Sequence, residues 1–97
     1  MITNKNKKQL KALANKSAMR YQIGKDSVDE DVFNMLNNAL KAHELIKIYF
    51  NKNIVDKMHE ISDIIVKKLN AELVDNIGHT IIIYRENKEK KNHIILL

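Results

Sequence analysis

Several stretches of the chain alternate between apolar and polar residues. Residues 19–23 (MRYQI) and 44–50 (ELIKIYF) place apolar side chains at every second position. Successive side chains of a strand point to opposite faces of its sheet, so this period of two predicts strands with one buried face. Two further apolar runs, 73–77 and 80–84, are joined by Gly78-His79 alone. So short a connection predicts an antiparallel hairpin.

Three other segments repeat their apolar residues every three or four positions, which predicts amphipathic helices. The first runs from a capping Thr3 to about Asn15, the second follows an N-cap at Asp29, and the third spans roughly residues 55–69. The apolar stripe of the first helix is thin and consists of Leu10, Leu13 and Ala14. We therefore expect this helix to lie on a larger body.

The predicted order is α-β-α-β-α-β-β, an α/β fold with three helices and a four-stranded mixed sheet. A chain of 97 residues has room for one compact domain, which we assign to residues 1–88, with residues 89–97 as a C-terminal tail. The sequence contains no apolar run of the ~18 residues that a membrane span needs, and no apolar secretory segment follows its start. The lack of cysteine suits the reducing cytoplasm. We expect a cytoplasmic monomer without a membrane partner.

Positive charge is concentrated at the start of the chain. Residues 1–25 contain seven lysines and arginines and no acidic residue, whereas the remainder carries ten basic and twelve acidic residues. A basic segment on a balanced body is typical of a surface that binds polyanions such as nucleic acids. Charge alone leaves a second interpretation open, a solvated lysine-rich helix.

No pattern in the sequence indicates catalysis. The four histidines show no metal-ligand spacing, and there is no cysteine to complete a metal site. No serine lies in a nucleophile motif or has an evident histidine partner. We therefore expect no enzymatic activity, no metal, no cofactor and no small-molecule substrate.

The segment Gly24-Lys25-Asp26-Ser27 joins the first predicted strand to the second predicted helix. A glycine before a helix lets backbone N–H groups approach a phosphate closely, and the lysine adds positive charge. Single-strand-binding KH domains use a GxxG loop in this way. The alternative is a turn that needs glycine only for a positive φ. The Asp26 carboxylate beside the proposed phosphate counts against anion binding.

The polar faces of the first two strands extend this candidate site. Arg20 and Gln22 lie on one strand, Lys47 and Tyr49 on the other. If the first helix folds back beside the Gly24 loop, its lysines form one basic surface that contacts phosphates. Tyr49 and Tyr84 could stack on a base, although packing is our preferred interpretation for Tyr84. The candidate RNA contacts from these residues are Lys5, Lys7, Lys8, Lys11, Arg20, Gln22, Gly24, Lys25 and Lys47.

Four ordered motifs carry a resemblance to a known family. They are TNKNKKQLKALA, QIGK before an acidic helix start, ELIKI and IGHTIIIYR. Together they resemble the CRM domain (chloroplast RNA splicing and ribosome maturation) in its bacterial single-domain YhbY form, over about residues 2–88. The resemblance implies a fold similar to the C-terminal domain of bacterial translation initiation factor three. It also implies RNA binding through the GxxG-like loop and the neighbouring basic residues.

Two positions depart from the family pattern. Ser27 stands where the family usually has a second glycine, and His43 stands where an arginine is usual. Serine lacks the freedom of glycine at positive φ, but its hydroxyl can donate a hydrogen bond, so Ser27 stays among the candidate contacts. The resemblance implies a non-enzymatic protein that binds ribosomal RNA during large (50S) subunit assembly. The alternative is a ribosome-associated protein-interaction module whose lysines serve solubility.

Overall fold

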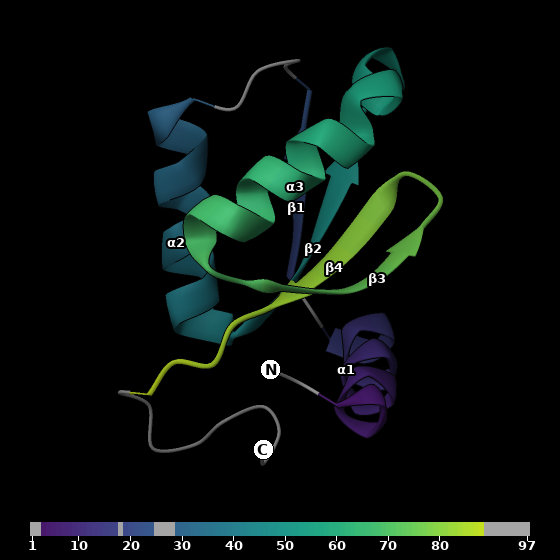
Figure 1. Cartoon of the computed structure of the whole chain (residues 1–97), viewed down its shortest axis with the longest axis vertical. Helices are drawn as coiled ribbons and strands as arrows, with labels where there is room; N and C mark the ends of the chain where they lie inside the picture. The colour runs from purple at the N-terminus through teal and green to yellow at the C-terminus, as the bar shows by residue number, and fades with distance from the viewer. Residues whose placement is uncertain (1–2, 18, 25–28, 89–97) are drawn as a thin grey trace.

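The computed structural model describes residues 3–17, 19–24 and 29–88, which form a four-stranded sheet with helices on both faces (Figure 1). The elements are α1 (Asn4–Ser17), β1 (Met19–Ile23), α2 (Glu30–His43), β2 (Leu45–Phe50), η1 (Lys52–Lys57), α3 (Met58–Leu69), β3 (Glu72–Ile77) and β4 (Thr80–Tyr84), where η1 is a 3₁₀ helix. The predicted α/β class and the order of helices and strands are confirmed. The proposed tail, 89–97, lies outside the described residues.

The strands lie in the order β1-β2-β4-β3. β1 runs parallel to β2, with Arg20 opposite Lys47, and β4 is antiparallel to both β2 and β3. Parallel neighbours need a crossover connection, which α2 supplies between β1 and β2. The sheet is therefore mixed, as predicted, and β2 and β4 are its two central strands.

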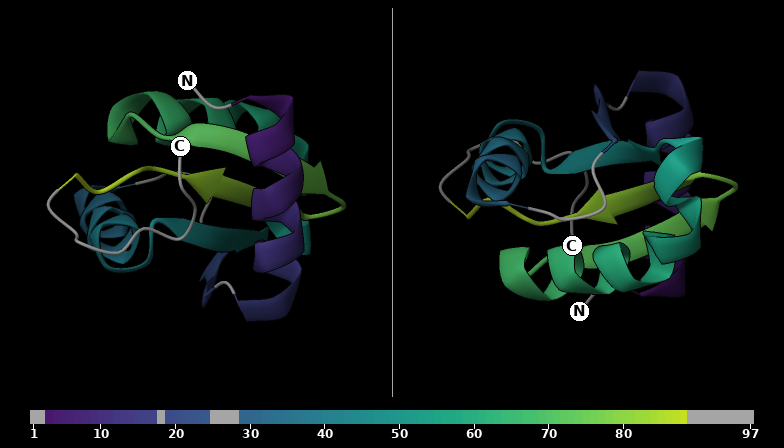
Figure 2. Two further views of the ribbon diagram at one scale, coloured as in Figure 1. Left: turned by 90° about the horizontal axis from the view of Figure 1, so that it is seen from below. Right: turned by 90° about the horizontal axis from the view of Figure 1, so that it is seen from above.

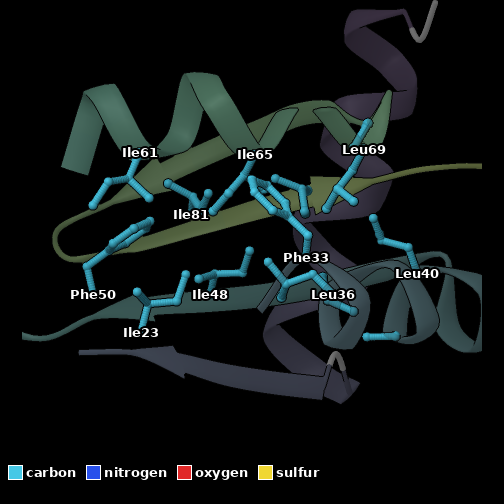
Figure 3. Packing of buried hydrophobic residues seen from close by; sticks show 14 of the residues in the cluster. Ile23, Phe33, Leu36, Leu40, Ile48, Phe50, Ile61, Ile65, Leu69 and Ile81 are labelled. Atoms are coloured by element: carbon cyan, nitrogen blue, oxygen red, sulfur yellow. The ribbon is translucent and has the colours of Figure 1, made fainter. Parts of the chain in front are cut away.

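One face of the sheet is buried beneath α2 and α3 (Figure 3). The cluster includes Phe33, Leu36 and Leu40 from α2, Ile61, Ile65 and Leu69 from α3, and Ile23, Ile48, Phe50 and Ile81 from the strands. Removing this apolar surface from water stabilises the fold by roughly 25 cal/mol per Å². The predicted inward positions of β2 are confirmed, whereas Met19 on the edge strand β1 stays 48% exposed.

Helix α1 packs on the opposite face of the sheet (Figure 2). Leu10 and Ala14 are fully buried and form a second, smaller cluster with residues of three strands. Those strand residues are Leu45, Val74, Ile82 and Tyr84. The thin apolar stripe of α1 is thus enough to dock the helix, because the sheet supplies the rest of the buried surface.

The first two helices begin at their predicted capping residues, whereas the third begins later than predicted. The Oγ1 atom of Thr3 accepts a hydrogen bond from the backbone N–H of Asn6 (3.1 Å), and an Asp29 carboxylate oxygen accepts one from Val32 (3.0 Å). The third helix was predicted to start near residue 55, but α3 begins at Met58 because residues 52–57 form the tighter η1 turn. That turn places Ile54 in the core at 2% exposure.

Glu44 caps the end of α2, and β2 begins one residue later than the predicted strand, at Leu45. Glu44 is fully buried with a φ of +62°, and its N–H still donates to the Leu40 carbonyl (2.8 Å). The Glu44 carbonyl accepts from the Arg85 N–H (2.8 Å), and its carboxylate accepts from the Asn87 N–H (2.8 Å). These hydrogen bonds to the residues after β4 hold Glu44 in a backbone conformation that is uncommon for residues other than glycine.

The Arg85 side chain joins β4 to both core-covering helices. Its guanidinium donates to the Asn37 side chain (2.9 Å) and carbonyl (3.2 Å) in α2, and to the Leu69 carbonyl (2.9 Å). Leu69 is the last residue of α3, where carbonyls lack helical partners and positive charge is favourable. Burial lowers the pKa of Arg85 from its ordinary value.

Replacing Arg85 with alanine should lower the free energy of unfolding by about 2–3 kcal/mol, because each hydrogen bond to a charged group contributes about 1.5–3 kcal/mol. Urea denaturation followed by circular dichroism measures the change. The control is Lys67→Ala, an exposed cation in the last turn of α3, which should change the stability by no more than about 0.5 kcal/mol. Equal losses in the two variants would contradict a structural role for Arg85.

Candidate nucleic-acid interface

Helix α1 covers only part of its face of the sheet. On β2, Leu45 is buried beneath α1, whereas Lys47 and Tyr49, the next residues on that face, are half-exposed. Arg20 and Gln22 lie opposite them on β1 and are exposed. The predicted polar positions of the two strands therefore lie together. We call Arg20, Gln22, Lys47 and Tyr49 the open sheet surface.

Two cations of the open sheet surface are not engaged by any acceptor in the described part of the chain. The central guanidinium carbon of Arg20 lies 4.6 Å from the centroid of the Tyr49 ring, a cation–π contact. Within the described ranges, no carboxylate or carbonyl accepts a hydrogen bond from Arg20 or Lys47. Among the described residues, their positive charges therefore have no counter-charge.

The lysines of α1 stand in different environments. Lys5 and Lys8 are exposed and Lys7 is half-buried. Lys11 forms an ion pair with Asp75 of β3, with Nζ and a carboxylate oxygen 3.2 Å apart. Because Lys11 neutralises a carboxylate, it adds less free charge to this surface than the other three.

Helix α1 lies at the end of the sheet where β1 begins, and β1 runs away from it toward the opposite end (Figure 1). The helix packs on Leu45, the first residue of β2, whereas Gly24 follows the carboxyl end of the parallel strand β1. Five residues of strand separate the two ends, which is roughly 16 Å at ~3.3 Å per residue. The condition under which the α1 lysines would join the Gly24 loop, a helix folded back beside that loop, is therefore not met. The open sheet surface lies between them instead.

Gly24 is explained by a close approach of Asn51. Its φ is not positive, unlike that of Gly78 at +59°, so the turn does not require glycine for that reason. A Cβ atom on Gly24 would lie 2.6 Å from the Asn51 side-chain nitrogen. Asn51 in turn donates its N–H to the Ile23 carbonyl (3.0 Å) and accepts a hydrogen bond from the Gln22 side chain. Gly24 thus leaves room for an amide that ties the end of β1 to the end of β2.

The amino terminus of α2 is acidic. The Asp29 side chain already occupies the Val32 N–H, and Glu30 and Asp31 follow in the first turn. A hollow of about 250 Å³ beside Gly24 is lined by Gln22, Ile23, Gly24, Asp29, Asp31 and Val32. These carboxylates disfavour a phosphate at this helix end. Lys25 and Ser27, the other predicted loop contacts, lie outside the described residues.

Two further ring side chains, Tyr84 and His79, lie near the open sheet surface. Burial, and then the charges of Glu44, Glu86 and Glu72, raises the pKa of Tyr84 to about 12. Tyr84 is 2% exposed beneath α1, which confirms that it packs. His79 was not predicted here; its ring lies 6.1 Å from that of Tyr49 because its carbonyl accepts from the Phe50 N–H (2.8 Å). Finding it required the β2–β4 pairing.

The described part of the chain contains no group of three or more His, Cys, Asp or Glu residues that could hold a metal ion. Among its helices, none is long and apolar enough to cross a membrane.

The variant Gly24→Ala should lose about 1 kcal/mol of stability, because the new Cβ displaces the Asn51 side-chain amide from its hydrogen bond with Gln22. In an Asn51→Ala background the same change should cost much less, with a coupling energy of at least about 0.5 kcal/mol in a double-mutant cycle. Chemical denaturation of the four proteins provides the cycle. An identical cost of Gly24→Ala in both backgrounds would show that Asn51 is not the reason for the glycine.

Comparisons with known proteins agree with this architecture. Residues 2–85 match the model of the CRS1 / YhbY (CRM) domain. The chain is 34% identical over 91 residues to the "Probable RNA-binding protein YqeI" of Bacillus subtilis, an alignment that covers 94% of this chain and 95% of the relative. It is 32% identical over 90 residues to an "RNA-binding protein" of Haemophilus influenzae, covering 93% and 91%. The solution structure of the hypothetical protein SAV1595 from Staphylococcus aureus matches with a TM-score of 0.75 at 36% identity, covering 94% of this chain and 95% of that one. This chain therefore belongs to the CRS1 / YhbY (CRM) domain family.

Proposed function

We propose that this protein is a non-enzymatic RNA-binding protein that contacts the phosphate backbone with its open sheet surface and the lysines of α1. The observation that carries the proposal is the pair of cations, Arg20 and Lys47, which lie on the part of the sheet face that α1 leaves uncovered and which no acceptor among the described residues engages. Arginine and lysine are the side chains that neutralise phosphates. Family membership supports this proposal, as do the relatives named RNA-binding proteins.

Ribosomal RNA is the target that we propose, with the protein acting as a cytoplasmic monomer on precursors of the large subunit. The support is the motif resemblance to the single-domain bacterial members of the family, together with a net charge of +5. The GxxG-like loop would extend the binding surface beyond β1 through Lys25. The competing function, a protein-interaction module on the ribosome, predicts a different response to charge removal.

The double variant Arg20→Gln with Lys47→Gln should bind RNA roughly a hundredfold more weakly, since each of the two charged hydrogen bonds contributes about 1.5 kcal/mol or more. The slope of log affinity against log salt should become shallower by ~0.7 for each phosphate of a single strand that the variant no longer neutralises. Fluorescence anisotropy with labelled RNA at several salt concentrations measures both quantities.

The matched control is Lys41→Gln with Lys67→Gln. These exposed lysines lie on α2 and α3, the helices that cover the other face of the sheet, and the same two charges are removed. Equal weakening in the two double variants would mean that net charge, and not the open sheet surface, governs binding.

A triple variant tests the role of α1. Changing Lys5, Lys7 and Lys8 to glutamine leaves the Lys11–Asp75 ion pair intact and preserves helix propensity. RNA affinity should fall while the unfolding midpoint stays near that of the parent. In sucrose gradients of cell extracts, the variant should move from large-subunit precursor fractions to the top. A variant that loses RNA affinity but still sediments with ribosomal particles would favour the protein-interaction module.

A further inference from the structure

We propose that Tyr49 is a positioning residue that holds Arg20 for a backbone phosphate, so that the open sheet surface binds RNA without reading its bases. This inference rests on the proposed function and specifies how the surface recognises its ligand. The more obvious role for an accessible tyrosine is to stack on a base. Three features of the surface argue against that role.

The first feature is that Arg20 already occupies the Tyr49 ring. Tyr49 lies two residues beyond Lys47, the partner of Arg20, so Arg20 reaches it diagonally across the β1–β2 pair. The guanidinium carbon lies 4.6 Å from the ring centroid. On the hairpin side, the His79 ring is 6.1 Å away and tilted by 44°. A base that stacked where Arg20 lies would have to displace the cation.

The second feature is the state of the Arg20 donors. Contact with a ring engages the charge of a guanidinium and leaves its N–H groups able to form two parallel bonds to phosphate. In the ranges that the structure describes, no protein group accepts from these donors. Arg20 is a long, exposed side chain whose rotamers must be ordered when it binds. Resting on Tyr49 orders it beforehand.

The third feature is that Tyr49 has no second phenylalanine or tyrosine beside it, among the described residues, with which to form a platform. Sheet surfaces that read RNA bases typically stack two or three bases on neighbouring aromatic side chains. The four other Phe and Tyr residues of the chain pack in the two clusters of the interior: Tyr21, Phe33, Phe50 and Tyr84. On the open sheet surface the neighbours of Tyr49 are cations and an amide, and the His79 ring beside it is tilted by 44° with the centroids 6.1 Å apart, so the two rings form no flat platform. The surface is therefore equipped for phosphates.

Salt dependence separates a positioning role from a stacking role. Arg20→Gln removes one charge and should lower the salt slope by up to ~0.7 on single-stranded RNA. Tyr49→Leu removes no charge. It should nevertheless lower both the RNA affinity and the salt slope, as Arg20→Gln does, because Arg20 is no longer held in place. Tyr49→Phe keeps the ring and should retain parental values of both. The double variant Arg20→Gln with Tyr49→Leu should bind no more weakly than Arg20→Gln alone.

The experiment measures fluorescence anisotropy for the parent and these four variants. The RNAs are oligo(A), oligo(U) and an oligo(A) of the same length in which abasic sites replace most bases. We expect the effect of Tyr49→Leu to be the same on all three RNAs. Thermal unfolding checks that each variant is folded, and Tyr49→Phe serves if Tyr49→Leu does not fold. In that case the affinities for the two RNAs are compared within each protein. If Tyr49→Phe and the parent each bind oligo(A) and the abasic RNA equally well, the inference is supported. If either protein binds oligo(A) markedly more tightly than the abasic RNA, the inference is overturned.

A Tyr49→Leu loss that is additive with Arg20→Gln and disappears on the abasic RNA would show that Tyr49 stacks on a base, and the inference would be wrong although RNA binding stands. An unchanged affinity and slope in Tyr49→Leu would overturn it as well. Failure of the parent protein to bind any of the three RNAs would instead contradict the proposed function itself, and the inference with it.

Discussion

The alternation of side chains along β2 determines what each face of the sheet can do. β2 is paired on both edges, so its register also sets the faces of β1 and β4. Its even-numbered residues enter the core beneath α2 and α3, and its odd-numbered ones meet α1 or remain half-exposed. A slip of one residue would bury Lys47 and expose Ile48. The hydrophobic core and the candidate RNA surface are thus two consequences of one pleat.

The features that were predictable from sequence are those decided by near neighbours. The capping of α2 by Asp29 needs only Val32, and the inward positions of β2 need only its own alternation. The open sheet surface was found for the same reason, since the polar positions of a strand share a face. Local rules of this kind are strong wherever one face of an element must be buried.

The features that were missed depend on residues far apart in the chain. The Glu44 carboxylate accepts a hydrogen bond from the N–H of Asn87, which is 43 residues away. No sequence pattern near residue 44 predicts a buried helix cap with a positive φ. Gly24 leaves room for the Asn51 side chain, which approaches only once β1 and β2 are paired. The position of α1 likewise followed from the strand order, which no local pattern contains. Lys25 and Ser27 remain predictions from sequence.

In the described part of the chain, β3 is an edge strand that pairs with β4 alone. The strand carries two exposed apolar residues, Leu73 and Ile77, beside backbone groups that could pair with another chain. The pairing register shifts between Leu73 and Asp75, so one residue is inserted and the regular row of donors and acceptors is broken. An irregular edge is a poor template for a neighbouring strand. A one-residue irregularity therefore gives this small sheet, whose edge strand carries exposed apolar residues, some protection against cross-β aggregation.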